Sequence, residues 1–125
     1  MSSEKLAQFA NQKYLNLESY RKDGTPVATP VWFAAGDGVF FIYSLANAGK
    51  VKRIRNNPRV RIMPCDIRGR PKGVWVGAEA RIADAATAVK GHRLLNQKYG
   101  LLKRAGDVFS RLRKRERAVI TIQID

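Results

Sequence analysis

Alternating apolar and polar residues dominate this chain and predict β-strands, while helical spacing is confined to a few segments. The longest alternation covers Val74–Ala83, where every second residue is apolar. Five further strands are predicted at Tyr14–Tyr20, Pro26–Phe33, Val39–Tyr43, Val60–Cys65 and Arg117–Asp125. Helices are predicted from Ser2 or Ser3 to about Gln12, at Lys50–Asn56, from the capping residue Asp84 to Tyr99, and at Asp107–Lys114. This order of elements predicts a mainly β fold with a few short peripheral helices.

The second predicted strand, Pro26–Phe33, contains a proline that cannot donate to a strand ladder. We therefore expect the strand to be broken, or to lie at an edge, at Pro30. Backbone groups left without a strand partner beside Trp32 would offer donors, acceptors and an apolar wall to a planar heterocycle. The alternative is that Trp32 is a core residue next to an edge bulge. Hairpin turns are expected on both sides of this strand, at Asp23-Gly24 and at Ala34–Gly38.

The segment after the third predicted strand has the order of an anion-binding site. The strand ends in Ser44, a loop of small residues follows at 46–49, and a basic helix begins at Lys50. The first amides of a helix lack internal partners, and the helix dipole favours an anion there. Lys50 and Arg53 share one helix face and can converge on a phosphate, while Val51 and Ile54 can be buried. The alternative is that these charges only solvate a surface helix.

Length and composition are those of one domain, residues 1–125, large enough for a core but near the size at which a second subunit helps. The net charge of +14 predicts an anionic partner, which could be a nucleic acid, an acidic membrane surface or an anionic cofactor. No segment approaches the roughly 18 apolar residues of a membrane span. The polar start MSSEKLAQ is unlike a signal peptide, so we expect a cytoplasmic protein with no membrane partner.

Reactive side chains are scarce. The chain has one cysteine, Cys65, and one histidine, His92, which cannot form a histidine/cysteine zinc site. The sequence has no nucleophile elbow, no Walker loop and no dinucleotide-binding glycine motif. If the protein is an enzyme, its reactive atom is expected to belong to a cofactor, with no catalytic side chain assigned.

One segment is similar to a known family. The combination of Tyr43-Ser44, Lys50 and Asn57-Pro58-Arg59-Val60 resembles the flavin-phosphate segment of the pyridoxamine 5'-phosphate oxidase-like proteins. The resemblance implies a split β-barrel of about six antiparallel strands, a homodimer with the cofactor at the subunit interface, and binding of FMN or the deazaflavin coenzyme F-420. Gly49 stands where the oxidases have an arginine, so Lys52 or Arg53 would have to supply the second charge.

The resemblance also implies the positions of the cofactor's parts. The phosphate would lie against Ser44, Lys50 and Arg53, and the ring against the strand around Trp32 and against a tryptophan of the second subunit. Lys72 falls near the place where the oxidases have a glutamine that touches the flavin. The predicted cofactor-binding residues are Pro30, Val31, Trp32, Tyr43, Ser44, Lys50, Lys52, Arg53, Lys72 and Trp75.

The function implied is a flavin- or deazaflavin-dependent oxidoreductase that transfers hydride to or from a small organic substrate. Coenzyme F-420 is preferred because its phosphate continues into lactate and a chain of glutamates, and the chain resembles small actinobacterial members described as deazaflavin-dependent. Further cations could offset these charges: Lys52, Arg55, Arg68, Arg70 and Lys72. Three alternatives are kept: an FMN-dependent oxidase or FMN-binding protein of the same fold, a basic nucleic-acid-binding module, and a haem-binding split barrel that would use His92.

Overall fold

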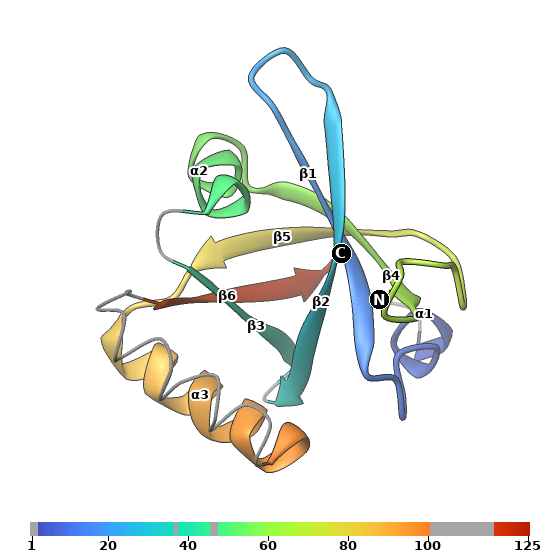
Figure 1. Ribbon diagram of the computed structural model, residues 1–125, viewed down its shortest axis with the longest axis vertical. Coiled ribbons are helices and arrows are strands. Elements are labelled where there is room, and N and C mark those ends of the chain that lie inside the picture. Colours follow the sequence, from blue (N-terminus) through green and yellow to red (C-terminus); the bar gives the residue numbers. More distant parts are fainter. Residues whose placement is uncertain (1–2, 37, 46–47, 101–116) are drawn as a thin grey trace.

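The computed structural model describes residues 3–36, 38–45, 48–100 and 117–125. The strands are β1 (Tyr14–Tyr20), β2 (Pro26–Gly36), β3 (Val39–Leu45), β4 (Arg59–Cys65), β5 (Val76–Ile82) and β6 (Arg117–Ile124). The helices within the described ranges are α1 (Ser3–Ala7), α2 (Gly49–Asn56) and α3 (Ala85–Tyr99). All strand pairs are antiparallel, and the sheet closes into a barrel in the order β1-β2-β3-β6-β5-β4 (Figure 1). The predicted mainly β barrel of six antiparallel strands with short helices is confirmed.

The barrel interior is filled by the apolar residues of the predicted alternation. The fully buried side chains on the inner face include Leu15, Leu17, Ile42, Ile62, Ile120 and Ile122. Helix α2 packs against β1 and β5 and adds Val51 and Ile54 to the same core (Figure 1). The basic helix is therefore attached to the barrel by its apolar stripe, and its other faces are left for charged residues.

Helix α3 covers the opposite part of the barrel wall, against β2, β3 and β6 (Figure 1). Its first turn is capped as predicted, because the Asp84 side chain accepts a hydrogen bond of 2.8 Å from the Thr87 amide. Close packing depends on Gly91, where an added Cβ would lie 2.7 Å from Val119 Cγ1 and 3.0 Å from Phe41 Cδ1. A glycine at this position lets the helix backbone approach the sheet.

Several element boundaries differ from the sequence prediction. Strand β2 continues to Gly36 rather than ending at Phe33, because 34–36 pair with β3. Strand β5 begins at Val76 rather than Val74, since the Gln8 side-chain amide donates to the Val74 carbonyl (3.1 Å) and accepts from its N–H (2.9 Å). Helix α1 ends at Ala7, not near Gln12. The helix predicted at 107–114 lies outside the described residues.

The barrel wall is split between β2 and β3. Strand β2 pairs with β1 over Pro26–Trp32 and with β3 over Phe33–Gly36. Strand β3 pairs with β2 only as far as Ile42, while its pairing with β6 continues to Leu45. The two strands therefore separate N-terminal to Phe33 on β2 and C-terminal to Ile42 on β3. The end of β3 leads toward α2 (Figure 1).

Candidate functional site

The part of β2 that faces the split has a free backbone edge. In a strand, the N–H and C=O of one residue point to the same edge, and those of the next residue point to the other. Just before β2, the Thr25 carbonyl accepts from the Arg21 N–H of the β1 side (2.9 Å). At the other end, the Phe33 N–H donates to the Tyr99 hydroxyl (2.9 Å), and this hydroxyl also donates to the Lys13 carbonyl beside β1. Odd-numbered residues of β2 therefore face β1 as far as Phe33. The backbone groups of Ala28, Pro30 and Trp32 face the split.

No described strand pairs with this edge of β2 between Pro26 and Trp32. Pro30 has no N–H, so its position on the free side breaks no ladder bond. The prediction that the strand lies at an edge at Pro30 is confirmed. The edge can offer the N–H of Trp32 and the carbonyls of Pro30 and Trp32 to a ring with both kinds of polar group.

The three residues predicted to form the ring wall do not share one face. Pro30 and Trp32 pair with Asn16 and Tyr14 on the outer face, whereas Val31 pairs with the buried Leu15 and packs against the core. The Trp32 ring stacks on the Tyr99 ring, with centroids 4.7 Å apart and planes 11° from parallel. One face of the Trp32 indole is therefore covered by α3 of the same chain.

Tyr99 anchors the end of α3 to the start of the split. Its hydroxyl accepts from Phe33 N–H and lies 2.7 Å from the Phe33 carbonyl and 2.6 Å from the Lys13 carbonyl. Burial raises the pKa of Tyr99 to about 12, so the hydroxyl remains a donor at neutral pH. The sequence places Tyr99 on a helix face but gives no sign of its partner 66 residues away.

Replacing Tyr99 with phenylalanine should keep the stacking on Trp32 and remove these hydrogen bonds. The Phe33 N–H and the Lys13 carbonyl would lose their partner, while the Phe33 carbonyl keeps its bond from Lys98 Nζ (2.8 Å), so the free energy of unfolding is expected to fall by about 1–3 kcal/mol. Urea denaturation measures this change. Tyr14→Phe is the matched control, because the Tyr14 hydroxyl bonds to no described residue; equal losses in both variants would contradict the anchoring role.

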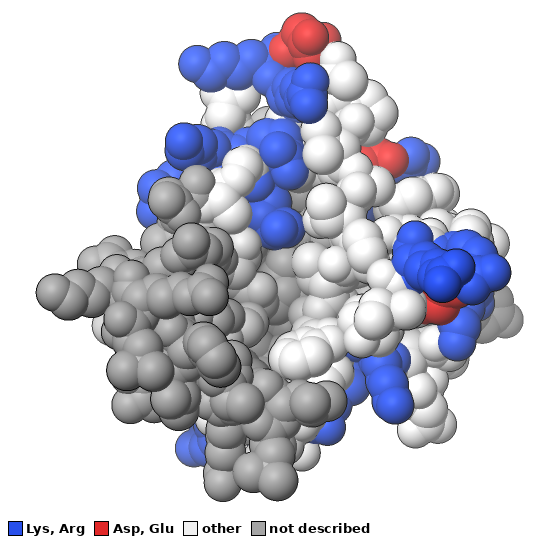
Figure 2. Space-filling view, in the orientation of Figure 1, with Lys and Arg blue, Asp and Glu red and all other residues white. Residues whose placement is uncertain are grey.

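Positive charges gather at the end of the barrel where α2 begins. The helix N-cap, Ala48, supplies no side-chain hydrogen bond, and the first turn holds no acidic residue. Figure 2 shows blue side chains over α2 and over the neighbouring β1–β2 hairpin. The cations of these two segments are Arg21, Lys22, Lys50, Lys52, Arg53 and Arg55. None of them forms a salt bridge with a described acidic residue, as expected of a site prepared for an anion.

Lys50, Arg53 and Arg21 act on one another electrostatically. Burial lowers the pKa of Lys50, and the charge of Arg53 lowers it further. Burial likewise lowers the pKa of Arg53, with a smaller contribution from Arg21. An anion bound among them would remove this mutual repulsion. Arg21 was not predicted as a site residue, because only the folded hairpin brings it near α2.

The guanidinium group of Arg53 lies beside the first residue of the helix, Gly49. Its Nε–H donates to the buried Ser19 hydroxyl at 2.7 Å. A Cβ added at Gly49 would lie 2.8 Å from Arg53 Nη1, so the guanidinium occupies the space beside that glycine. The arginine missing at position 49 thus has a counterpart in Arg53, whereas Lys52 is exposed. Of the two residues predicted to supply the second charge, the geometry favours Arg53.

Ser44 and Tyr43 point to opposite faces of β3. Ser44 is only 9% exposed and pairs with Ala118, on the inner face at the end of the barrel that α2 covers. Tyr43 lies on the outer face, where its ring meets the half-buried His92 ring edge-on at 5.4 Å beneath α3. Ser44 therefore lies on the inner face near the end of β3 that precedes α2, and Tyr43 lies on the opposite face.

Lys72 and Trp75 lie between β4 and β5, on the outer face of the barrel. The Arg61 guanidinium lies 4.8 Å above the Trp75 ring and pairs with Glu18 at 2.8 Å, and this hydrogen bond lowers the pKa of Glu18. Lys72 borders a cavity near Cys65. Neither residue contacts Lys50 or Arg53 within the described chain. Their contact with a cofactor held by a second subunit stays a prediction.

The described residues contain neither a metal-binding cluster nor a membrane-spanning helix. Among them, no group of three or more His, Cys, Asp or Glu side chains is placed to hold a metal ion. None of the helices in the described ranges is long and apolar enough to span a bilayer.

Comparison with known proteins places the fold in a family. The family model for pyridoxamine 5'-phosphate oxidase matches residues 2–125. No curated protein matches the sequence. One similar solved structure is the haem storage protein HutZ from Vibrio cholerae, with a TM-score of 0.74, 18% identity, and coverage of 98% of this chain and 88% of that one.

Two other similar structures carry names that mention flavin-type cofactors. A protein named F420 reductase has a TM-score of 0.60 and 20% identity, over 95% of this chain and 91% of that one. A FAD-binding protein from Mesorhizobium loti has a TM-score of 0.61 and 20% identity, over 100% of this chain and 89% of that one. At these identities the likeness concerns the fold. The match over residues 2–125 shows that the chain belongs to the pyridoxamine 5'-phosphate oxidase family.

Proposed function

We propose that this protein binds a phosphorylated flavin-type cofactor and acts as an oxidoreductase on a small organic substrate. The observation that carries the proposal is the cation cluster of Lys50, Arg53 and Arg21, which forms no salt bridge with a described residue and lies beside the split. The free edge of β2 begins at the same end of the barrel. A phosphate and a polar-edged ring are the two chemical groups that these features would bind.

The residues present fit such a cofactor. Lys50, Arg53 and the first amides of α2 would hold the phosphate, with Ser44 at the neighbouring strand end. The Trp32 N–H and the Pro30 carbonyl would fix the ring edge. The bound cofactor would supply the atom that exchanges hydride. The protein contributes binding, orientation and the electrostatic setting.

Between the two cofactors we favour coenzyme F-420, with FMN as the alternative. Two half-buried cations suffice for one phosphate, yet α2 also carries Lys52 and Arg55 on exposed positions, and Lys22 lies in the adjacent hairpin. A cofactor whose phosphate continues into several carboxylates would use these charges. The structural likeness to a protein named F420 reductase is compatible with this choice.

We further propose a homodimer with the cofactor at the subunit interface. Trp75 makes no contact with Lys50 or Arg53 among the described residues and would reach the cofactor from a second copy. Trp75 is half-exposed on the outer face, and aromatic side chains of this kind are common at interfaces.

A direct titration tests the proposal. Binding of coenzyme F-420 is expected to quench its fluorescence, and FMN is expected to bind more weakly. An oligonucleotide titrated in parallel measures the nucleic-acid alternative, whose affinity would fall steeply with added salt. Oligonucleotide binding without binding of either cofactor would overturn the proposal.

A further inference from the structure

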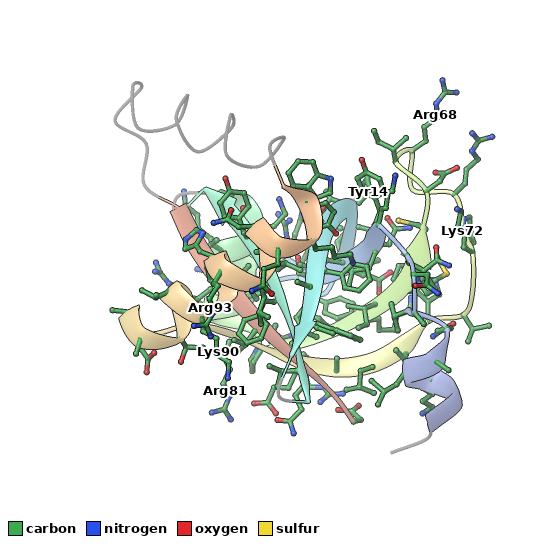
Figure 3. The ribbon with its side chains drawn as sticks, turned by 90° about the horizontal axis from the view of Figure 1, so that it is seen from below. Tyr14, Arg68, Lys72, Arg81, Lys90 and Arg93 are labelled. Atoms are coloured by element: carbon green, nitrogen blue, oxygen red, sulfur yellow. The ribbon has the colours of Figure 1, made fainter. Side chains whose placement is uncertain are left out.

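The cavity bordered by Lys72 lies on the outer face, away from α2. Its volume is about 430 Å³, and its walls come from the start of β1, the end of β4 and the loop that follows β4. Lys13, Tyr14, Cys65, Asp66 and Lys72 border it. Figure 3 shows Tyr14 and Lys72 on the same side of the molecule, with Arg68 farther out on the loop. The size is that of a small-molecule site.

The cavity is positively charged. The Asp66 carboxylate is already occupied, because it accepts from the Arg68 and Arg70 amides (2.9 Å each) and from Arg70 Nε (2.8 Å). These hydrogen bonds lower the pKa of Asp66. Lys13 and Lys72 form no salt bridge with a described residue. Two lysines without a counter-ion therefore border one cavity, which favours an anionic occupant.

The charge of Lys72 reaches the interior of the cavity. Burial raises the pKa of the Cys65 thiol to about 11, Asp66 adds to the increase, and Lys72 opposes it. The ammonium group is thus close enough to act on a side chain in the cavity wall. Because the thiol stays protonated at neutral pH, Cys65 provides a neutral wall and no nucleophile.

The cavity also adjoins the ring wall. Tyr14 pairs with Trp32 on one side and with Cys65 on the other, so these residues form a row across three strands. Residues directly opposite on neighbouring strands have Cβ atoms about 5 Å apart. The Lys13 carbonyl is bonded to Tyr99, which stacks on Trp32. An occupant of the cavity would therefore lie one strand away from the ring wall.

We propose that this cavity binds a small organic anion, a carboxylate- or phosphate-bearing molecule whose apolar part lies against Tyr14 and Ile67. The lysines at the rim, Lys13 and Lys72, hold its charged group. The occupant would be a ligand in addition to the cofactor, so the inference goes beyond the proposed function. It gives Lys72 a role in binding this anion in place of the contact with the cofactor ring expected from the sequence.

The test uses benzoate and its neutral analogue benzamide as probes, followed by backbone amide shifts in NMR spectra of the full chain. Benzoate is expected to shift the amides at 11–14, 65–67 and 72, and benzamide to bind at least about tenfold more weakly. Lys13→Ala and Lys72→Ala should each weaken benzoate binding by about threefold to tenfold. Lys5→Ala is the matched control, because Lys5 is exposed on α1 and does not border the cavity.

Three outcomes would overturn the inference: equal binding of benzoate and benzamide, shifts confined to α2, or unchanged affinity in both lysine variants. Titrating the same samples with coenzyme F-420 and FMN separates this inference from the proposed function. If the cofactor binds and benzoate does not, only the anion cavity fails. If benzoate binds and neither cofactor does, the anion cavity stands and the proposed function fails.

Discussion

Replacing Lys50 with alanine is expected to weaken cofactor binding by about 1.5–3 kcal/mol, a loss of roughly 10- to 150-fold in affinity. Lys50 is half-buried at the start of α2, and burial together with Arg53 lowers its pKa. A charge in this setting gains more from a phosphate than an exposed one does, since less water screens the interaction. Fluorescence titration of the variant with coenzyme F-420 and with FMN measures the loss.

The charge-matched control is Arg93→Ala, on the exposed side of α3. This change also lowers the net charge by one, so it reports any general attraction between a basic protein and an anion. Its affinity is expected to stay within about twofold of the parent. Equal weakening in the Lys50 and Arg93 variants would show that net charge, and not a site at α2, attracts the cofactor.

Replacing Ile54 with alanine is expected to lower the free energy of unfolding by about 2–5 kcal/mol. Ile54 is 2% exposed and joins the core at the barrel end covered by α2, so truncation leaves a cavity there. Because typical domains are stable by only about 5–15 kcal/mol, the effect is a large part of the total. Urea denaturation followed by tryptophan fluorescence measures it.

Ile67→Ala is the matched control for stability, because Ile67 is 66% exposed in the loop after β4. The same chemical change is expected to cost less than about 0.5 kcal/mol there. A similar loss of stability in the two variants would mean that α2 is not anchored to the core through Ile54. The Ile54 variant should also bind the cofactor more weakly, since α2 carries Lys50 and Arg53.

The strands could be predicted because one side of each strand faces the barrel interior. That alternation located β1 correctly and placed the start of β2 and the end of β6 within one residue. The prediction was wrong where the backbone of a segment bonds to a residue that is distant in the sequence or lies on another strand. Val74 continues the alternation of β5, but its backbone groups bond to the Gln8 side chain. Ala34 and Ala35 look like turn residues, but they pair with Phe41 and Phe40 on β3.

The candidate site was predictable in the parts that are local in sequence. Ser44, Lys50 and Arg53 follow one another along a strand, a loop and a helix, and their joint contact with a phosphate stays a prediction. The contributions of Arg21 and Tyr99 depend on contacts across the fold. The Tyr99 hydroxyl meets the Lys13 carbonyl 86 residues away, a contact for which helical spacing gives no signal.

The central claim, that the start of α2 binds a cofactor phosphate, is tested most directly by comparing cofactors with and without that group. FMN and riboflavin form one pair, and coenzyme F-420 and its phosphate-free deazariboflavin core form the other. We predict that the phosphorylated member of at least one pair binds at least about 100-fold more tightly, and that most of this difference disappears in the Lys50→Ala variant. Equal affinities within both pairs, or a difference that Lys50→Ala leaves intact, would contradict the account.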